Sequence, residues 1–261
     1  MITAASNSRI KRLVQLNQKS KLRRTEDVFL AEGVKMFQEA PREQLQEVYV
    51  SESFLEKCSC REHLEEVGYE VVSDSVFSKI SDTCTPQGVL CVLKQFHYNI
   101  EEMLRDKAPL FLLLENIQDP GNLGTMLRTG EGAGVSGIIM SRDTVDLYNP
   151  KVIRSTMGSI YRVPFYYADD FAAAVHQVQQ AGVSVYAAHL RGKNSYACQD
   201  YTKGTAFLIG NEGNGLREET AELADCYIRI PMEGKVESLN AAVASSILMY
   251  EAHRQRATIE K

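Results

Sequence analysis

Short apolar runs alternate with segments of helical spacing along the first part of the chain, and this alternation predicts a compact α/β unit of roughly ninety residues. Ile10, Leu13 and Val14 have the spacing of one helix, which Ser6 or Asn7 would cap. The predicted strands cover residues 28–30, 48–50, 69–72 and 89–93. The predicted helices between them cover residues 33–40, 52–67 and 74–80, and residues 85–88 form a turn.

A more regular alternation from residue 108 onward predicts a mostly parallel sheet with helices on both faces. The predicted strands are 110–114, 136–140, 183–188 and 205–209, with another near 226–230. The predicted helices are 122–132, 149–157, 170–181, 217–223 and 238–255. The sequence therefore predicts two domains, residues 1–97 and 108–261, joined by a polar linker at 98–107.

Composition narrows the class of protein. The 261 residues carry a net charge of −5, and no apolar run approaches the ~18 residues of a membrane span. The amino terminus lacks the apolar segment of a signal peptide. The six cysteines form no C-x-x-C pair, which favours reduced thiols over disulfides or a zinc finger. We therefore expect a cytoplasmic protein that does not span a membrane.

Basic residues concentrate at the amino terminus, although the chain as a whole is acidic. Residues 1–25 hold seven basic side chains and no acidic one. Such a segment on an acidic body is typical of a local phosphate-binding surface, and an ordinary solvated helix is the alternative. The candidate RNA contacts in this segment are Arg9, Lys11, Arg12, Lys21, Arg23 and Arg24.

The segment 110–132 carries the first candidate site. Its apolar run ends in a loop punctuated by Pro120 and Gly121, and a helix starts near Asn122. In α/β enzymes such loops place reactive groups above the carboxyl edge of a parallel sheet. This segment presents the amide of Asn122 and the guanidinium of Arg128. They need not share a helix face, but the bends of the loop would bring them to one cleft.

The glycine-rich loop 210–216 directly follows the predicted strand 205–209. Glycines such as Gly210 let the backbone approach a ligand closely. The loop lacks the Lys-Ser/Thr of a P-loop, which argues against a nucleoside triphosphate site. Glu212 is either a ligand contact or a carboxylate that stabilises the loop, and spacing alone leaves both open.

Residues 230–240 lead into the last predicted helix, for which Ser238 is the predicted N-cap. Asn240 is polar beside an apolar stripe, which makes it a candidate functional residue. The predicted stripe consists of Leu239, Val243, Ile247 and Tyr250.

Other enzyme classes lack support. Gly132–Gly137 fits G-x-G-x-x-G, but it closes a predicted helix and leads into a strand, whereas a dinucleotide fingerprint opens a helix. The five histidines show no metal-ligand spacing, and no G-x-S-x-G is present. These observations exclude a dehydrogenase, a serine hydrolase and a metal enzyme, and we predict no metal site.

Together, the segment Asn122–Arg128, the loop 210–216 and the segment 230–240 resemble the three motifs of the SpoU, or TrmH-like, family. This family comprises S-adenosylmethionine-dependent RNA ribose 2′-O-methyltransferases of the SPOUT superfamily. The resemblance covers about residues 110–256, in order. Phe29–Gly33 and Thr85–Gly88 also resemble the family's RNA-binding domain. The resemblance implies a trefoil-knotted domain with a mostly parallel sheet flanked by helices, preceded by a small α/β RNA-binding domain, and a homodimer.

The resemblance also implies roles for individual residues. Asn122, Arg128, Glu212, Ser238 and Asn240 match positions associated with catalysis or RNA binding. The residues that match the cofactor site are Ile209, Gly210, Ile230, Met232, Ser238 and Leu239. Because a guanidinium rarely loses its proton, we expect Arg128 to stabilise the target phosphate and the developing alkoxide electrostatically. Arg154 and Ser155 are secondary candidates for RNA contact, with plain helix surface as the alternative.

Three functions fit these features unequally. We expect methylation of a ribose 2′-hydroxyl in large-subunit (23S-type) ribosomal RNA, because a dedicated RNA-binding domain suits a large folded substrate. The alternatives are a transfer-RNA ribose methyltransferase and a non-catalytic RNA-binding or ribosome-assembly factor that retains the fold. The intact motif residues argue against the non-catalytic alternative.

Overall fold

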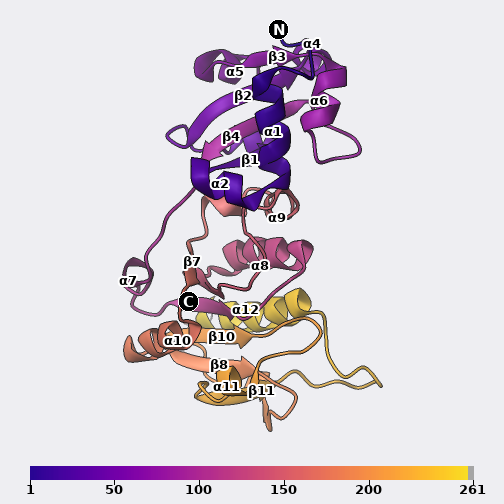
Figure 1. Cartoon of the computed structure of the whole chain (residues 1–261). Helices are drawn as coiled ribbons and strands as arrows, with labels where there is room; N and C mark the ends of the chain where they lie inside the picture. Colours follow the sequence, from indigo (N-terminus) through magenta and orange to yellow (C-terminus); the bar gives the residue numbers. More distant parts are fainter. Residues whose placement is uncertain (258–261) are drawn as a thin grey trace. The chain divides into compact units, whose positions relative to one another are not determined.

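The computed structural model describes residues 1–257, and the chain divides into two compact units (Figure 1). Unit 1 comprises Met1–Phe96 together with Asp146–Tyr161, and unit 2 comprises His97–Val145 together with the chain from Arg162 onward. The chain therefore leaves unit 2 and returns to it. The segment 146–161, which the predicted boundaries assign to the second domain, packs with the first unit.

Unit 1 is built on a four-stranded sheet with the order β1-β4-β2-β3. β4 pairs antiparallel with both β1 and β2, whereas β2 and β3 are parallel. The strands are β1 (Val28–Glu32), β2 (Leu45–Ser51), β3 (Glu70–Val72) and β4 (Val89–Lys94). The helices are α1 (Ser8–Gln18), α2 (Ser20–Glu26), α3 (Val34–Gln38), α4 (Glu52–Lys57), α5 (Arg61–Val67), α6 (Asp74–Ile80) and α9 (Pro150–Thr156), followed by the 3₁₀ turn η1 (Ser159–Tyr161).

The core of unit 1 forms where α1 and α6 pack on the sheet. Ile10 and Leu13 of α1 are buried with Phe77 of α6 and Leu90 of β4. Asn7 caps α1, since its side-chain oxygen accepts the amide of Arg9 at 2.9 Å. The predicted helical face and one of its two predicted caps are therefore confirmed.

The segment 146–161 is hydrogen-bonded into unit 1 at several points. The Tyr148 hydroxyl accepts the Phe96 amide at 2.6 Å and donates to the Phe96 carbonyl at 3.0 Å. The Tyr161 hydroxyl donates to the Met36 carbonyl at 2.9 Å. Asp146 pairs with the buried Arg23. These contacts explain why a segment that is distant in sequence belongs to this unit.

Unit 2 contains a sheet with the order β7-β6-β5-β10-β8-β11-β9, and its neighbouring strands all pair in parallel within the described residues. The strands are β5 (Leu110–Leu114), β6 (Gly137–Ser141), β7 (Phe165–Ala168), β8 (Ser184–Ala188), β9 (Asn194–Ser195), β10 (Thr205–Ile209) and β11 (Cys226–Arg229). The helices are α7 (Ile100–Met103), α8 (Pro120–Ala133), α10 (Phe171–Gln180), α11 (Glu218–Ala221) and α12 (Ala241–Ala257), with the 3₁₀ turn η2 (Tyr196–Cys198). The neighbouring strands β5 and β10 are buried along their whole length, as expected for central parallel strands.

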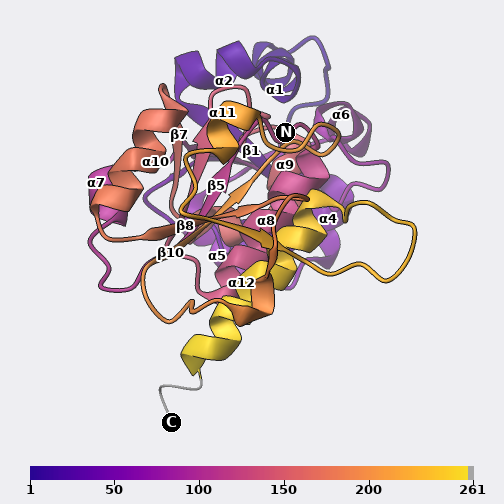
Figure 2. The same ribbon diagram turned by 90° about the horizontal axis from the view of Figure 1, so that it is seen from below.

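α12 packs along α8 in unit 2 (Figure 2). Small residues make this approach close: a side chain at Gly130 would meet Met249, and one at Gly132 would meet the Tyr250 hydroxyl. The predicted apolar stripe of α12 is wrong in part, because Val243 and Tyr250 are 48% and 50% exposed. The buried face consists instead of Ala241, Ala242, Ser245, Leu248, Met249 and Ala252.

Two other features differ from the predictions. The segment 52–67 is two helices, because Cys58 is extended and interrupts the helical path. The edge strand β7 was not predicted, since Phe165–Ala168 is short and has no alternation of apolar and polar residues. No helix within residues 1–257 combines the length and apolarity that crossing a membrane requires.

Candidate functional site

The first two candidate loops meet because the strands that precede them are neighbours. β5 and β10 pair in parallel, with Leu114 opposite Ile209, so the loops 115–119 and 210–216 leave the same edge of the sheet. The Asn211 amide nitrogen donates to the Asn116 carbonyl at 2.8 Å. These two loops lie about ninety residues apart in the sequence, and the order of the strands brings them together.

Glu212 is the centre of the resulting cluster. Its carboxylate accepts the backbone amides of Gln118 and Asp119 at 3.1 and 3.0 Å, and the side-chain amide of Asn122 at 3.0 Å. Burial alone would raise the pKa of Glu212, but these hydrogen bonds outweigh burial and hold the pKa below its usual value. A carboxylate that is already occupied and strongly ionised is a poor proton acceptor. The structure thus favours the loop-stabilising interpretation of Glu212.

Asn122 links Glu212 to Asn240. The Asn240 side chain donates to the Asn122 side-chain oxygen at 2.9 Å, and Asn122 donates onward to Glu212. The direction is fixed at both ends, because the Asn240 oxygen accepts the amides of Ala242 and Val243, and the carboxylate of Glu212 only accepts. Three residues from three distant segments therefore form one ordered chain of hydrogen bonds.

The N-cap of α12 is Asn240, and the predicted cap Ser238 is wrong. α12 begins at Ala241, and the Asn240 backbone carbonyl accepts the Ala244 amide at 2.9 Å. The helix therefore begins three residues later than predicted, and an asparagine is as good a cap as a serine. Ser238 is exposed and makes no hydrogen bond to the rest of residues 1–257, which leaves its hydroxyl available.

Arg128 lies six residues beyond Asn122 on α8 and takes no part in the cluster's hydrogen bonds. Its side chain is exposed, and within residues 1–257 no hydrogen bond or ion pair holds it. An unpaired guanidinium beside an ordered amide cluster is suited to a phosphate or another oxyanion.

The backbone of the predicted cofactor residues leaves polar groups open. Ile230, Met232 and Leu239 are half-buried, and their backbone groups make no hydrogen bond to other described residues. These backbone groups therefore have hydrogen-bonding capacity left for solvent or for a ligand. At Gly210, any side chain would lie 2.2 Å from the Gly215 backbone, which explains the glycine. Ile209 is buried at the end of β10.

The predicted basic residues of unit 1 divide into two groups. Arg9 pairs with Glu70, and Arg12 pairs with Glu26 and Glu47. Arg23 is only 3% exposed and pairs with Asp146 at 2.5 Å, so the structure contradicts its predicted role as a free phosphate contact. Of the six predicted residues, Lys11, Lys21 and Arg24 are exposed and have no ion pair within residues 1–257.

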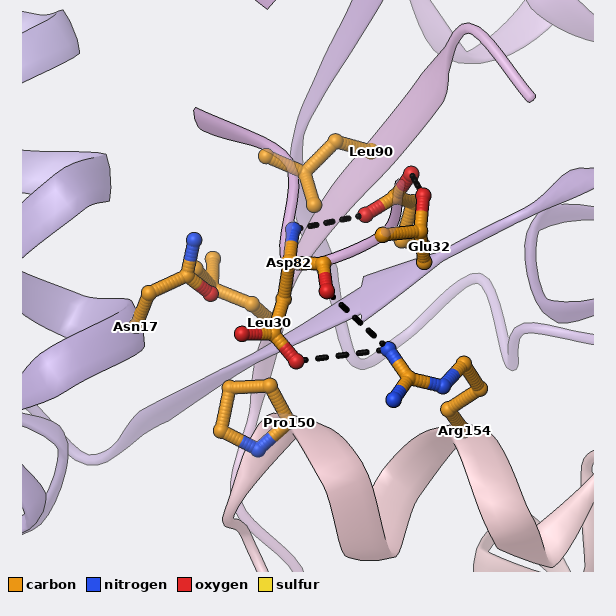
Figure 3. Close-up of a pocket in the computed structure, with 8 residues that line it drawn as sticks. Asn17, Leu30, Glu32, Asp82, Leu90, Pro150 and Arg154 are labelled. Carbon is orange, nitrogen blue, oxygen red and sulfur yellow. Dashed lines mark hydrogen bonds and ion pairs between the residues drawn. The ribbon is translucent and has the colours of Figure 1, made fainter. Parts of the chain in front are cut away.

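Arg154 and Ser155 both have partners in unit 1. Figure 3 shows the Arg154 guanidinium directed at the backbone and side-chain oxygens of Asp82, both at 3.3 Å. The Ser155 hydroxyl donates to the Lys151 carbonyl at 2.9 Å. Arg154 remains 46% exposed, so its ion pair does not bury the charge. The cavity beside it has a volume of about 20 Å³, room for little more than a water molecule.

A larger cleft of about 590 Å³ lies in unit 2 at the carboxyl ends of β5, β6 and β7. Both arginines that line it are paired with acidic lining residues, Arg142 with Asp169, and Arg217 with Asp143 and Glu115. Among the described residues no group of three or more histidine, cysteine or acidic side chains is arranged to hold a metal ion.

Sequence reasoning missed several residues that build the cluster. Gln118 and Asp119 act through backbone amides, which carry no signal in side-chain type. Asn211 closes the glycine-rich loop, since its side-chain oxygen accepts the amides of Gly213 and Asn214, both at 3.0 Å. An Asn two residues before a glycine is a recognisable turn signal that would have identified this one.

The sequence matches known families over both units. Residues 109–250 match the SpoU rRNA methylase family, and residues 7–91 match an MRM3-like substrate binding domain. The 23S rRNA (guanosine(2553)-2′-O)-methyltransferase RlmP of Bacillus subtilis is 32% identical over 252 residues, covering 95% of this chain and 97% of that protein. The 23S rRNA (guanosine-2′-O-)-methyltransferase RlmB of Ralstonia nicotianae is 33% identical over 184 residues, covering 69% of this chain and 74% of that protein.

Solved structures agree over nearly the whole chain. An AdoMet-bound rRNA methyltransferase from Sinorhizobium meliloti superimposes with a TM-score of 0.83 at 31% identity, covering 97% of both chains. The SpoU methyltransferase AviRb from Streptomyces viridochromogenes, in complex with AdoMet, gives a TM-score of 0.88 at 26% identity, covering 97% of this chain and 99% of that one.

Proposed function

The chain belongs to the SpoU rRNA methylase family, and we propose that it transfers a methyl group from S-adenosylmethionine to a ribose 2′-hydroxyl of large-subunit ribosomal RNA. The observation that carries this proposal is the ordered chain Asn240–Asn122–Glu212, with the unpaired Arg128 on the same helix as Asn122. The substrate is proposed from the relatives, RlmP and RlmB, that are named for 23S rRNA.

Each residue of the site has a proposed role. Arg128 binds the phosphate next to the target ribose and stabilises the negative charge that develops on the 2′-oxygen. Glu212 holds Asn122 in one orientation, and this leaves one N–H each on Asn122 and Asn240 for the ribose. Ser238 offers an exposed hydroxyl two residues before Asn240. Positioning of this kind supplies on the order of 7–11 kcal/mol to a two-substrate reaction.

The residues present fit the cofactor. The open backbone groups of Ile230, Met232 and Leu239 would hold its adenosine, together with Ile209, Gly210 and Ser238. When bound, S-adenosylmethionine supplies a methyl group already activated by the positive sulfur. The protein therefore has to orient the ribose and exclude water, and the ordered amides of the cluster serve the first purpose.

Three further features belong to this proposal: a trefoil knot in unit 2, a homodimer and a cytoplasmic location. Knots are rare exceptions among folds, and this one is proposed from family membership. Support for the homodimer comes from α12, where Val243 and Tyr250 remain about half exposed among the described residues. Large apolar side chains on one helix are suited to a second copy of the chain.

A transfer-RNA substrate and a non-catalytic binding factor are the alternative functions. The intact set of motif residues favours catalysis over binding alone, because Asn122, Glu212 and Asn240 form an ordered chain of hydrogen bonds on the helix and loops that flank Arg128. The match to a substrate binding domain over residues 7–91 supports a large folded RNA.

The test is transfer of labelled methyl from S-adenosylmethionine to total RNA by wild type and by Arg128→Ala. We expect label as a 2′-O-methylated nucleotide in large-subunit rRNA, and a loss of at least about a hundredfold in the variant with cofactor affinity kept. Label in transfer RNA would favour the first alternative, and cofactor binding without any transfer would favour the second. Weakened cofactor binding by Arg128→Ala would contradict the role given to Arg128.

A further inference from the structure

Glu115 contacts both ends of the glycine-rich loop 210–216, although it follows a different strand, β5. Its backbone amide donates to the carbonyl of Ile209, the residue before the loop, at 2.9 Å. Its carboxylate accepts the amide of Arg217, the residue after the loop, at 2.9 Å. The Thr220 hydroxyl donates to the second carboxylate oxygen at 2.5 Å. Glu115 itself is 1% exposed, so this carboxylate is buried and fully engaged.

The loop between these two attachment points is internally closed. Asn211 and Gly215 exchange backbone hydrogen bonds at 3.0 and 2.9 Å, and the Asn211 side chain accepts two further loop amides. These hydrogen bonds constrain the internal shape of the loop. Its position is therefore set by its ends and by the few contacts that it makes with the loop 115–119.

The two loops hold each other through reciprocal carboxylates. Glu212 of the second loop accepts the amides of Gln118 and Asp119, and Glu115 at the start of the first loop accepts the amide of Arg217. The Arg217 guanidinium adds a longer contact to Glu115 at 3.5 Å and also pairs with Asp143. Hydrogen bonds to a buried, ionised acceptor are roughly twice as strong as neutral ones.

We propose that Glu115 is a positioning residue for methyl transfer: by fixing both ends of the loop 210–216 on β5, it sets where Glu212 and Gly210 stand. The inference rests on the proposed function, because Glu212 orients Asn122 and Gly210 adjoins the proposed cofactor site. Glu115 is not a catalytic residue, since its carboxylate is directed at Arg217 and Thr220.

Glu115→Gln tests this role with little change in shape. Arg217 and Thr220 donate to different carboxylate oxygens of Glu115, and glutamine replaces one of these oxygens by an NH2 group, so one of the two hydrogen bonds cannot form as it does with Glu115. We expect kcat for methyl transfer to fall about tenfold, and the Kd for S-adenosylmethionine to rise by a similar factor, at a temperature where circular dichroism shows a folded protein. Glu222→Gln, an exposed carboxylate just after α11, is the matched control and should match wild type.

Coupling to Glu212 separates positioning from plain stability. If Glu115 acts through the loop, the double variant Glu115→Gln/Glu212→Gln will lose little more activity than the worse single variant. Independent structural roles would make the two losses multiply, which would overturn the inference. Thr220→Val should lose less methyl transfer activity than Glu115→Gln, and Thr220→Ser, which keeps the hydroxyl, should retain the activity of wild type. These two variants test the same role if Glu115→Gln fails to fold.

The cofactor measurement also separates this inference from the proposed function. Wild type that binds S-adenosylmethionine but methylates no RNA would defeat the proposed function, and the Kd comparison would still decide the role of Glu115. An unchanged Kd and kcat in Glu115→Gln, with a lowered melting temperature, would reduce Glu115 to a structural residue.

Discussion

The basic helices of unit 1 and the amide cluster of unit 2 both carry side chains with predicted roles in RNA methylation, but the fold uses them differently. In unit 1, Arg9, Arg12 and Arg23 are paired with acidic residues that lie between 14 and 123 positions away. In unit 2, Asn122, Glu212 and Asn240 are paired with one another. Pairing and burial together remove Arg23 from a phosphate surface, whereas pairing orders the amides of the cluster for a substrate.

The difference shows that a high local density of basic residues does not determine which of them are available to bind phosphate. Seven basic side chains crowd the first 25 residues, yet the acids that neutralise three of them come from elsewhere in unit 1. A cluster of basic residues in the sequence therefore predicts a functional site less well than polar residues that follow neighbouring parallel strands, because the fold brings the latter together.

The largest effect is expected at Arg23. Its side chain is buried, and its guanidinium donates to the Leu16 carbonyl at 2.6 Å and pairs with Asp146. Arg23→Ala leaves Asp146 without its partner and empties a packed site, which should cost about 3 kcal/mol of unfolding free energy. Urea denaturation followed by circular dichroism measures this loss.

Arg24→Ala is the matched control, since Arg24 is the next residue and is exposed without an ion pair among the described residues. Its stability should change by less than about 0.5 kcal/mol, while its affinity for RNA should fall and depend less steeply on salt. If Arg24→Ala were the less stable of the two, the division of the basic residues into paired and available groups would be wrong.

Much of the fold was predictable, because its central strands are continuous apolar runs. Residues 110–114 and 205–209 were placed correctly, since strands buried on both faces leave a clear signal. β7 escaped prediction as a short edge strand, and the order of the strands is a tertiary property. The same holds for the packing of 146–161 with unit 1, which depends on single hydroxyls such as those of Tyr148 and Tyr161.

The candidate site was predictable in its residues but not in their connections. Asn122, Glu212 and Asn240 were identified from their places in loops and at a helix start. The hydrogen bonds between them were not predictable, because several partners are backbone amides and the orientation of an asparagine side chain depends on its neighbours. Glu115 was assigned no role, since nothing in its position directly after an apolar run indicates that its carboxylate is buried.

A smaller effect should separate Asn240 from Ser238. Asn240→Ala removes the cap of α12 and should cost about 1 kcal/mol of unfolding free energy, whereas Ser238→Ala should cost less than about 0.5 kcal/mol. Asn240→Asp keeps an oxygen for the cap but loses the donor to Asn122. That variant should therefore stay close to wild type in stability and lose methyl transfer. Equal stability losses in Asn240→Ala and Ser238→Ala would contradict the observed helix start.

The smallest expected effect is the pH dependence of the stability that the hydrogen-bonded Glu212 carboxylate contributes. The folded-state pKa of Glu212 lies below the ordinary value of 4.5, so the carboxylate stabilises the fold fully above that value. This contribution is lost as the pH falls below 4.5 and through the lowered folded-state pKa. The difference in unfolding free energy between wild type and Glu212→Gln, measured in urea from pH 7 to pH 3, isolates this one group, since the other carboxylates are common to both proteins. The difference should stay constant down to about pH 5 and then shrink. A difference that already disappears near neutral pH would mean that the hydrogen bonds to Gln118, Asp119 and Asn122 do not hold Glu212 in its ionised form, and the cluster would lose its anchor.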